Sequence, residues 1–407
     1  MDQNHANRAT SWPDSEGIRL LRSVATAMVR LGEATGTQSL SRPYPEEAQS
    51  ALNRTVLACL LLQAEPPTSL PDLVAWAAQR PLDRWPLTVP ADAIRPGALL
   101  LDEVTHQPTQ LCYEWAVDAE ESTALSEQPF MSSASTRCRE EEYPEAYRAF
   151  RRLLIRHPVL THRALVTLPA ADDRDLGPVG ELLHEIYQPA PAAFLDRRRR
   201  VYTACGRCHA LLHPTTTDRL WCERRTCQNQ DSVRPGREYR ADEDGGIHLL
   251  IRPLRQWVSA PGILEERLAR KLEKVGADVE LWPDYGAYGM RVRMPGGRTL
   301  AVEHKDWTNP ALLGRRAFPP LSGPPYDRCV WVVPAARLRE QPTFRMTFER
   351  YRPTRMPELM SDKDLVESVR KAVGPNRTVV SLSHATLTKT EPSSSEATET
   401  ELTEGLF

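Results

Sequence analysis

Four cysteines lie within 23 consecutive residues of this chain, and their spacing constrains the fold more than any other feature. The segment reads C-x2-C, thirteen intervening residues, and then C-x4-C. A CxxC turn can present two thiolates to one ion, and the second pair can complete a tetrahedron around it. The pattern predicts a small structural zinc site held by Cys205, Cys208, Cys222 and Cys227. A redox dithiol or a chance cluster is the alternative interpretation.

The rest of the composition excludes two classes of protein. A secreted disulfide scaffold would use most of its cysteines in a short chain, whereas this chain has 407 residues and four of its eight cysteines are scattered. The longest apolar run, Val56 to Leu62, is seven residues long, and a membrane span needs about 20. The polar N-terminus shows no secretory signal. We therefore expect a cytoplasmic protein of two or three domains with no membrane partner.

The first 190 residues have mainly helical periodicity. We assign residues 1–190 to a mostly α-helical N-terminal region that acts as a docking or nucleic-acid adaptor. Docking is favoured, and a winged helix that reads DNA is the alternative. Within this region, residues 97–118 favour a strand pair, and residues 119–137 are polar and indicate a loop. The predicted helices cover residues 18–31, 45–63, 71–79, 144–155 and 178–187.

Residues 200–245 form the predicted zinc-binding module, and its surroundings are basic. Between Asp196 and Lys274 there are seventeen Lys and Arg residues against eleven Asp and Glu residues, in a chain of net charge −2. Because arginine forks match phosphate groups, four arginines before the first cysteine pair are a candidate nucleic-acid contact, with a solvated charged face as the alternative. The four arginines are Arg197, Arg198, Arg199 and Arg200.

At the other end of the chain, the composition of residues 388–407 predicts a disordered acidic tail.

The segment from Pro261 to Asp306 carries the strongest indication of chemistry. It predicts a helix that ends at Gly276, followed by three strands with a Pro-Gly-Gly turn between the last two. Glu303 and Lys305 lie two residues apart in the last strand, so their side chains share one face of the sheet. A carboxylate at this place can hold Mg²⁺, and the lysine can orient a water molecule or stabilise a pentavalent phosphate. The predicted strands cover residues 278–282, 288–294 and 298–305.

This order of elements, with Pro283-Asp284 upstream of the Glu-x-Lys strand, resembles the PD-(D/E)xK, restriction-endonuclease-like nuclease superfamily. The core of that superfamily runs α-β-β-β-α-β, and its last two elements would be residues 309–316 and the strand CVWVVP, residues 329–334. More narrowly, the motifs PGILEERL, VELWPDYGAYGMRV and GGRTLAVEHKDWTNPALLGR resemble the restriction-endonuclease-fold protein that accompanies prokaryotic PIWI proteins of the PIWI-RE (pPIWI-RE) type. The resemblance implies an α/β nuclease domain over residues 246–375, with a mixed sheet flanked by helices.

The same resemblance implies a role for each residue at a matching position. Asp284 and Glu303 would bind Mg²⁺ or Mn²⁺, together with the backbone carbonyl of His304. Lys305 would act on the attacking water, and Glu265 would be an additional helix acid. It also implies nucleic acid as a partner, either DNA or an RNA–DNA hybrid. A PIWI-RE protein and a DinG-type helicase would recruit the chain in a bacterial anti-phage or anti-plasmid defence system.

The predicted hairpin also contains an observation against activity. If the turn has three residues, Met294 pairs with Arg298 and Gly289 lies opposite Glu303, where the superfamily has an acid. Asp284 lies five residues earlier and must reach in from the connection between two strands. The Glu-x-Lys motif and the resemblance nevertheless predict a metal-dependent endodeoxyribonuclease. The alternatives left open are a decayed nuclease that only binds nucleic acid as a scaffold, and a zinc-dependent transcription regulator.

Overall fold

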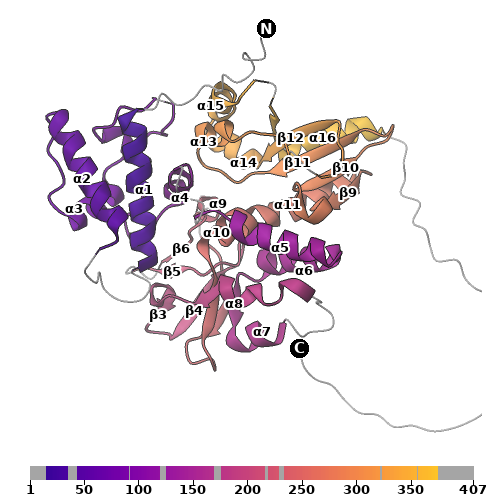
Figure 1. Cartoon of the computed structure of the whole chain (residues 1–407), viewed down its shortest axis with the longest axis horizontal. Coiled ribbons are helices and arrows are strands. Elements are labelled where there is room, and N and C mark those ends of the chain that lie inside the picture. Colours follow the sequence, from indigo (N-terminus) through magenta and orange to yellow (C-terminus); the bar gives the residue numbers. More distant parts are fainter. Residues whose placement is uncertain are drawn as a thin grey trace, which may run out of the picture.

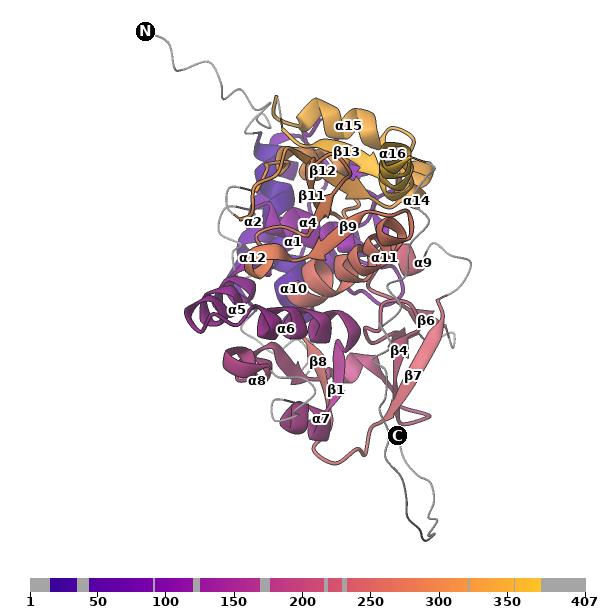
Figure 2. The ribbon, with the colours of Figure 1, turned by 90° about the vertical axis from the view of Figure 1, so that its right-hand side faces the viewer.

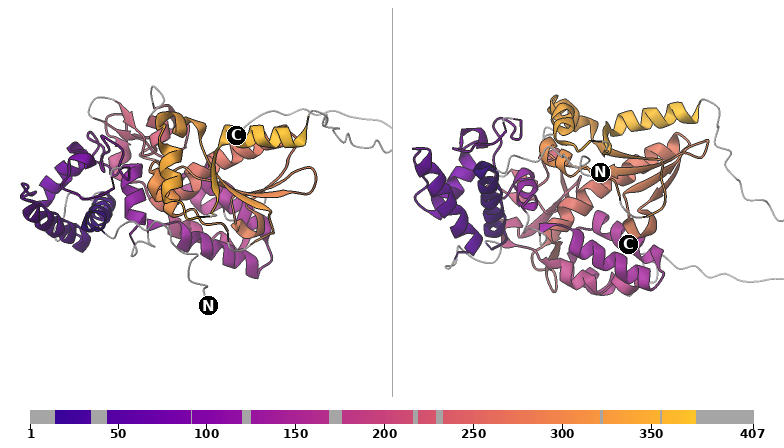
Figure 3. Two further views of the ribbon diagram at one scale, coloured as in Figure 1. Left: turned by 90° about the horizontal axis from the view of Figure 1, so that it is seen from above. Right: turned by 45° about the horizontal axis from the view of Figure 1, so that its top comes forward.

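The computed structural model describes residues 15–34, 44–90, 92–119, 125–168, 176–215, 219–228, 233–320, 323–354 and 356–374. These residues form a helical N-terminal bundle, a middle part that contains the four cysteines, and a C-terminal mixed sheet (Figure 1). Seen from above, the bundle and the mixed sheet lie at opposite ends of the molecule (Figure 3). The tail predicted over residues 388–407 lies outside the described residues. Among the described helices, none has the length and apolar character that a membrane crossing needs.

The N-terminal bundle forms because each long helix has one apolar face. The first helix packs against the second and the fourth, and it buries Leu21, Val24 and Met28 completely or almost so. The hydroxyl of Ser69 accepts a hydrogen bond from the backbone N–H of Asp72 and so caps the third helix. The three helices predicted for this part are confirmed as α1 (Glu16–Ala34), α2 (Glu46–Leu61) and α3 (Leu70–Gln79). The bundle also contains a 3-10 turn at Leu82–Arg84 and a helix that was not predicted, α4 (Gln110–Val117).

The strand pair predicted over residues 97–118 is wrong. Residues 110–117 form α4 instead, and the hydroxyl of Thr109 caps its first turn. One isolated bridge, between Leu101 and Pro108, is the β-like pairing recorded in this segment. Every residue of α4 except Leu111 is buried. The segment therefore lacks the alternation of apolar and polar positions that distinguishes a surface helix in a sequence.

The loop predicted over residues 119–137 is also wrong for its second half, because α5 spans Gln128–Glu140. This helix buries Met131, Ala134 and Cys138 on a narrow stripe. Its other described positions are mostly Ser, Thr and Arg, which weaken a hydrophobic pattern. The packing of α5 against α6 therefore decides its structure more than its own sequence does.

The middle part combines short helices with three small antiparallel sheets, ordered β1-β8-β2, β3-β4-β7 and β5-β6. Strand β8 follows the cysteines in sequence, yet it pairs with β1 and β2, which precede them. The helix predicted over residues 178–187 is shorter than expected. The elements are α6 (Pro144–Arg156), β1 (Val159–Thr161), α7 (His162–Thr167), α8 (Leu182–Ile186), β2 (Tyr187–Pro189), β3 (Leu195–Asp196), β4 (Val201–Cys205), β5 (His213–Pro214), β6 (Leu220–Trp221), α9 (Arg225–Gln228), β7 (Pro235–Arg240) and β8 (Ile247–Leu250).

The C-terminal part is a five-stranded mixed sheet of order β13-β12-β11-β10-β9. Strands β9, β10 and β11 are antiparallel, whereas β11, β12 and β13 are parallel. Leucine and valine side chains of α11 and α16 share one core with the sheet strands. The elements are α10 (Arg252–Leu254), a π-helical turn (Arg255–Ser259), α11 (Ala260–Lys274), β9 (Asp278–Leu281), α12 (Pro283–Gly286), β10 (Met290–Arg293), β11 (Thr299–His304), α13 (Pro310–Arg315), β12 (Arg328–Val333), α14 (Ala335–Glu340), α15 (Phe344–Tyr351), β13 (Glu358–Ser361) and α16 (Asp362–Val373).

The predicted order helix, three strands, helix, strand is confirmed by α11, β9, β10, β11, α13 and β12. Gly276 has φ +90° just after α11, as a helix-ending glycine requires. Met290 pairs with Val302, and the N–H of Met294 donates to the carbonyl of Arg298 at 2.8 Å. This is the predicted register, so Gly289 does lie beside Glu303.

Candidate active site

A cleft of 770 Å³ separates the ends of β10 and β11 from helices α5 and α6. In Figure 2, α12 lies between α5 and the strands of the mixed sheet. Residues from both sides line the cleft, including Arg139 and Arg151 from the helices. The predicted site residues Glu265, Asp284, Glu303, His304 and Lys305 all line it as well.

Glu303 and Lys305 form the centre of the cleft. The Nζ atom of Lys305 donates to Oε2 of Glu303 at 2.8 Å, and the backbone N–H of Gly289 donates to Oε1 at 3.0 Å. Burial alone would lower the pKa of Lys305, but the charge and hydrogen bond of Glu303 outweigh it and raise the pKa. Lys305 therefore stays an ammonium group. Its Nζ atom lies 4.9 Å from the ring centre of Trp331, a cation–π distance.

Glu265 lies on the other side of Gly289 and is 3% exposed. The indole N–H of Trp282 donates to its Oε2 atom at 2.8 Å. Its Oε1 atom lies 3.1 Å from the place that a Cβ atom on Gly289 would take. The two carboxylates of Glu265 and Glu303 therefore flank one glycine, and Glu265 occupies the space that an acid at position 289 would need.

We expect Gly289→Ala to destabilise the protein and to displace Glu265. The new Cβ atom would lie 2.9 Å from the carbonyl oxygen of Val302, which belongs to the backbone and cannot rotate away. Overpacking of this kind costs about 1–3 kcal/mol, to be measured by urea unfolding. Gly296→Asn in the hairpin turn is the matched control, because no atom lies within 4 Å of its Cβ position and Asn tolerates its φ of +86°. Equal stability of the two variants would contradict the crowding argument.

Asp284 lies in a strained turn and contacts an arginine. Trp282, Asp284 and Tyr285 all have φ between +47° and +56°, a left-handed conformation that costs roughly 1–2 kcal/mol per residue. Arg139 donates to Oδ1 of Asp284 at 2.9 Å and to its backbone carbonyl at 3.2 Å, and its guanidinium lies 4.8 Å from the ring centre of Tyr285. The Asp284 carboxylate is thus held by Arg139, while Glu303 is held by Gly289 and Lys305. Strain of this kind is concentrated at functional sites in proteins.

Four arginines of helices α5 and α6, which the sequence alone did not identify, pair with acidic residues of the C-terminal part. Burial would lower the pKa of Arg151, but the neighbouring Glu265 raises it. Glu127, just before α5, also lines the cleft, and burial raises the pKa of its carboxyl group. No motif marks these residues, because their acidic partners are more than 100 residues away in the chain. The pairs are Arg139–Asp284, Arg148–Glu280, Arg151–Glu265 and Arg156–Glu266, with N–O distances of 2.9, 3.2, 3.4 and 3.0 Å.

Asp306, the residue after Lys305, connects the end of β11 to the loop between Cys222 and Cys227, here called the cysteine loop. Asp306 is buried and accepts from Nε of Arg224 at 2.8 Å and from Nη2 of Arg337 at 3.3 Å. Burial raises the pKa of Asp306, but these two guanidinium groups outweigh it and hold the pKa at about 2. Thr226 donates to the same carboxylate at 3.4 Å. Since Arg224 and Thr226 lie between Cys222 and Cys227, the cysteine loop fixes the end of the strand that carries Lys305.

The four clustered cysteines converge on one point. Their sulfur atoms all lie within 4.8 Å of one another, and all four residues are buried. The sulfur atoms of Cys208 and Cys222 are 3.6 Å apart, close to the roughly 3.8 Å that two thiolates reach around a tetrahedral ion at 2.3 Å. The donor set could therefore hold a metal ion such as zinc.

The four predicted arginines lie apart from the cleft. Arg197, Arg198, Arg199 and Arg200 form the exposed turn between β3 and β4, at the end of the molecule away from β10 and β11 (Figure 1). Arg199 pairs with Glu238 at 2.8 Å. None of the four is among the described residues that line the cleft. Their role in nucleic-acid binding stays a prediction.

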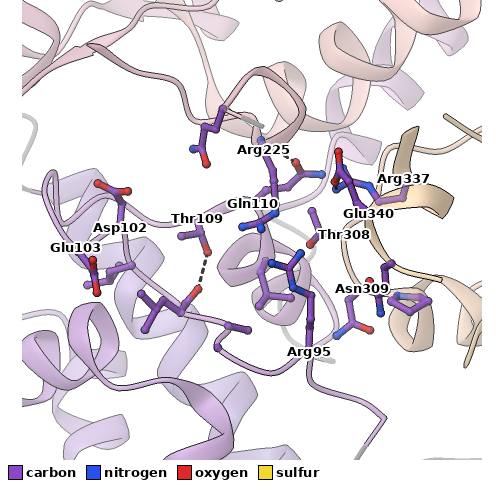
Figure 4. Close-up of a pocket in the computed structure, with 18 of the residues that line it drawn as sticks. Arg95, Asp102, Glu103, Thr109, Gln110, Arg225, Thr308, Asn309, Arg337 and Glu340 are labelled. Carbon is purple, nitrogen blue, oxygen red and sulfur yellow. Dashed lines mark hydrogen bonds and ion pairs between the residues drawn. The ribbon is translucent and has the colours of Figure 1, made fainter. Parts of the chain in front are cut away.

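A second cavity of 240 Å³ lies where the N-terminal bundle, the cysteine loop and the mixed sheet meet. Arg95 and Arg225 extend into it from opposite sides, and Arg337 and Glu340 line it near α14 (Figure 4). The predicted site residues are not among those that line it. The cleft with Glu303 and Lys305 is therefore the candidate active site.

Two family models match the chain. Residues 20–161 match a model described as "pPIWI_RE three-gene island domain Y", and residues 262–377 match one described as "REase associating with pPIWI_RE". Searches of curated proteins and of solved structures gave no match. The cleft lies between the two matched segments, because α5 and α6 fall in the first and the Glu303 strand in the second. The chain thus belongs to the REase-like proteins of the pPIWI_RE system, with a domain Y in its first half and an REase domain in its second.

Proposed function

We propose that this protein is a metal-dependent nuclease that hydrolyses phosphodiester bonds of nucleic acid, most simply of DNA, within a bacterial defence system. The supporting observation is the arrangement of Glu265 and Glu303 on either side of Gly289, with Lys305 bonded to Glu303. The space for an acid at position 289 is filled by Glu265. The glycine is therefore compatible with an active site, although at the level of the sequence it was the observation that left a decayed nuclease open.

In this proposal the carboxylates of Glu265 and Glu303, with the backbone carbonyl of His304, hold Mg²⁺ or Mn²⁺. Oxygen ligands of this kind suit both ions, and a bound divalent ion supplies Lewis acidity and a more acidic water. Lys305 keeps its proton because of Glu303, and it orients the attacking water and stabilises negative charge on the phosphate. Arg139 holds the Asp284 carboxylate in an ion pair, so Asp284 becomes a metal ligand only when this pair opens. Arg139 therefore controls the position of this acid.

The cysteine cluster serves structure in this proposal. Four thiolates leave no open coordination position on a tetrahedral zinc ion, and such sites contribute folding energy instead of catalysis. The cysteine loop supports the active site because its Arg224 donates a hydrogen bond to Asp306, the residue that directly follows Lys305. Both matched models name pPIWI_RE and one of them names a three-gene island, which suggests partners encoded with the protein. We propose a PIWI-RE protein and a DinG-type helicase among them.

Cleavage by the purified full-length protein tests the proposed function. We expect cleavage of an oligonucleotide with Mg²⁺ or Mn²⁺, and none with EDTA. Glu303→Gln, Glu265→Gln and Lys305→Met should each lower the rate by about 100- to 1,000-fold, as loss of one charge-stabilising group does in other enzymes. The product yield on labelled single-stranded, double-stranded and hybrid substrates measures the rate.

Glu266→Gln is the matched control for Glu265→Gln. Glu266 is the next residue on α11, but it pairs with Arg156 and is not among the described residues that line the cleft. It should keep the wild-type rate. If the wild-type protein binds nucleic acid but cleaves none of the substrates, even with its partners present, the chain is a scaffold and the nuclease proposal fails.

A further inference from the structure

The size of the cleft limits what can reach Glu303. The cleft has 770 Å³, within the range of about 300–1,000 Å³ that suits a small ligand. The Glu303 side chain is only 17% exposed. A DNA duplex is about 20 Å across, so a phosphate on its outside reaches Glu303 only if the whole helix enters between the walls of the cleft.

The cleft does not widen freely, because protein forms both of its walls. Arg139 and Arg151 of domain Y are bonded to Asp284 and Glu265 of the REase domain across it. The Arg151–Glu265 pair is largely buried, with side chains 14% and 4% exposed. Separation of the walls would leave that buried acid without its cation, which is costly in proteins. A ligand of this site has to fit between walls that stay joined by the buried Arg151–Glu265 pair, so rotation of other side chains is the adjustment open to it.

The walls carry flat aromatic rings beside the charged groups. Trp257 and Trp307 both line the cleft, and their rings are 4.7 Å apart at 33°. The guanidinium of Arg316 lies 5.3 Å from the ring centre of Trp307. Trp307 is only 7% exposed and lies against Trp257 and Arg316, so the half-buried Trp257 is the ring available to a ligand. Aromatic rings stack on the faces of nucleic-acid bases. In a duplex those faces are covered by neighbouring base pairs, whereas in an unpaired strand they are available.

Some donors in these walls have no acceptor. The indole N–H groups of Trp257 and Trp331 and the Nε–H of Arg151 are buried and have no hydrogen-bond partner among the described residues. A buried donor without a partner costs free energy. Phosphate oxygens and base carbonyls are acceptors, so a nucleotide in the cleft would supply the missing partners. The donors of the walls that have no partner therefore match the acceptor groups that an unpaired strand exposes.

We infer that the cleft accepts an unpaired strand of nucleic acid and excludes the double helix. This inference rests on the proposed function, because it concerns the substrate of the same site. A base stacks on Trp257 while a phosphate of the same strand lies beside Lys305 and Glu303. Duplex DNA becomes a substrate only where it is opened, for example at a bubble, a fork or a displaced strand.

Binding and cleavage should be measured separately. The full-length Glu303→Gln protein is titrated in Mg²⁺ with three fluorescent 20-nucleotide probes of one sequence: a single strand, a blunt duplex and a duplex with a four-nucleotide bubble. We expect the single strand to bind at least 10-fold more tightly than the blunt duplex, with the bubble in between. A duplex that binds as tightly as the single strand overturns the inference.

Wild-type cleavage of the same probes distinguishes the two proposals. Cuts confined to the single strand and to the bubble support both. Efficient cutting of the blunt duplex overturns the single-strand inference and leaves the nuclease intact. A single-strand preference in binding with no cleavage of any probe refutes the nuclease and leaves the binding inference standing.

Variants of Trp257 connect the preference to this cleft. Trp257→Leu should weaken single-strand binding by about 10-fold or more, and Trp257→Phe should weaken it less because it keeps a ring. Arg156→Ala is the control, because Arg156 pairs with Glu266 and is not among the described cleft residues. Thermal unfolding shows whether each variant is folded. If folded Trp257→Leu binds the single strand as well as wild type, the inference is wrong.

Discussion

Removal of the proposed zinc ion from the cysteine cluster is expected to unfold the middle of the protein. For small zinc modules, the free energy of binding is on the order of 10–16 kcal/mol at neutral pH, as large as the total stability of about 5–15 kcal/mol of a typical domain. All four cysteines are buried in the same core as Leu153 and Leu250. Loss of the ion would therefore leave four thiols close together in an apolar core. It would destabilise the packing of that core as well as the cysteine loop itself.

The experiment compares Cys222→Ser with the wild-type protein. We expect about one zinc ion per chain in the wild type by atomic spectroscopy, and loss of zinc together with cooperative thermal unfolding at a much lower temperature in the variant. Cys329→Ser is the control, since Cys329 is half-buried on β12 and lies outside the cluster. A zinc-free protein with wild-type thermal stability would contradict a structural role.

Asp306→Asn is expected to lower the free energy of unfolding by about 3–5 kcal/mol, the usual cost of a buried ion pair that loses one partner. Asp306 is 5% exposed, and its partners Arg224 and Arg337 are equally buried. Asparagine has nearly the same volume, so the loss reports charge and not packing. Because Asp306 follows Lys305, we also expect slower cleavage. Urea unfolding and the cleavage assay measure the two effects.

The effect of Asp306→Asn should depend on pH. The pKa of Asp306 in the folded protein is held at about 2, below its ordinary value of 3.8. A depressed pKa of an acid means that its contribution to stability is present above about pH 4 and is lost as the pH falls towards 2. The difference between wild type and variant should therefore be largest near neutral pH and should shrink in acid. Asp242→Asn is the control, because the Arg240–Asp242 pair is exposed and should change stability little.

The sequence predicted the C-terminal sheet well because its patterns are local. Gly276 ends α11, and the Pro-Gly-Gly turn sets the register of β10 and β11. Alternation along β11 and into Lys305, the first residue after it, places Glu303 and Lys305 on one face. Each of these depends on backbone geometry over a few residues. Residues 110–117 were mispredicted because all of them except Leu111 are buried, so tertiary packing overrode a weak local signal.

By itself, the sequence determined the four-cysteine cluster, the order of elements in the REase domain, and the place of Glu303 beside Lys305 and Gly289. Only the tertiary structure decided that Glu265 occupies the space beside Gly289, that Arg139 holds Asp284, and that domain Y forms one wall of the cleft. Spacing along a helix or strand follows from the chain geometry shared by all proteins. Contacts between side chains more than a hundred residues apart depend on how whole elements pack, and a single sequence carries no periodic signal for them.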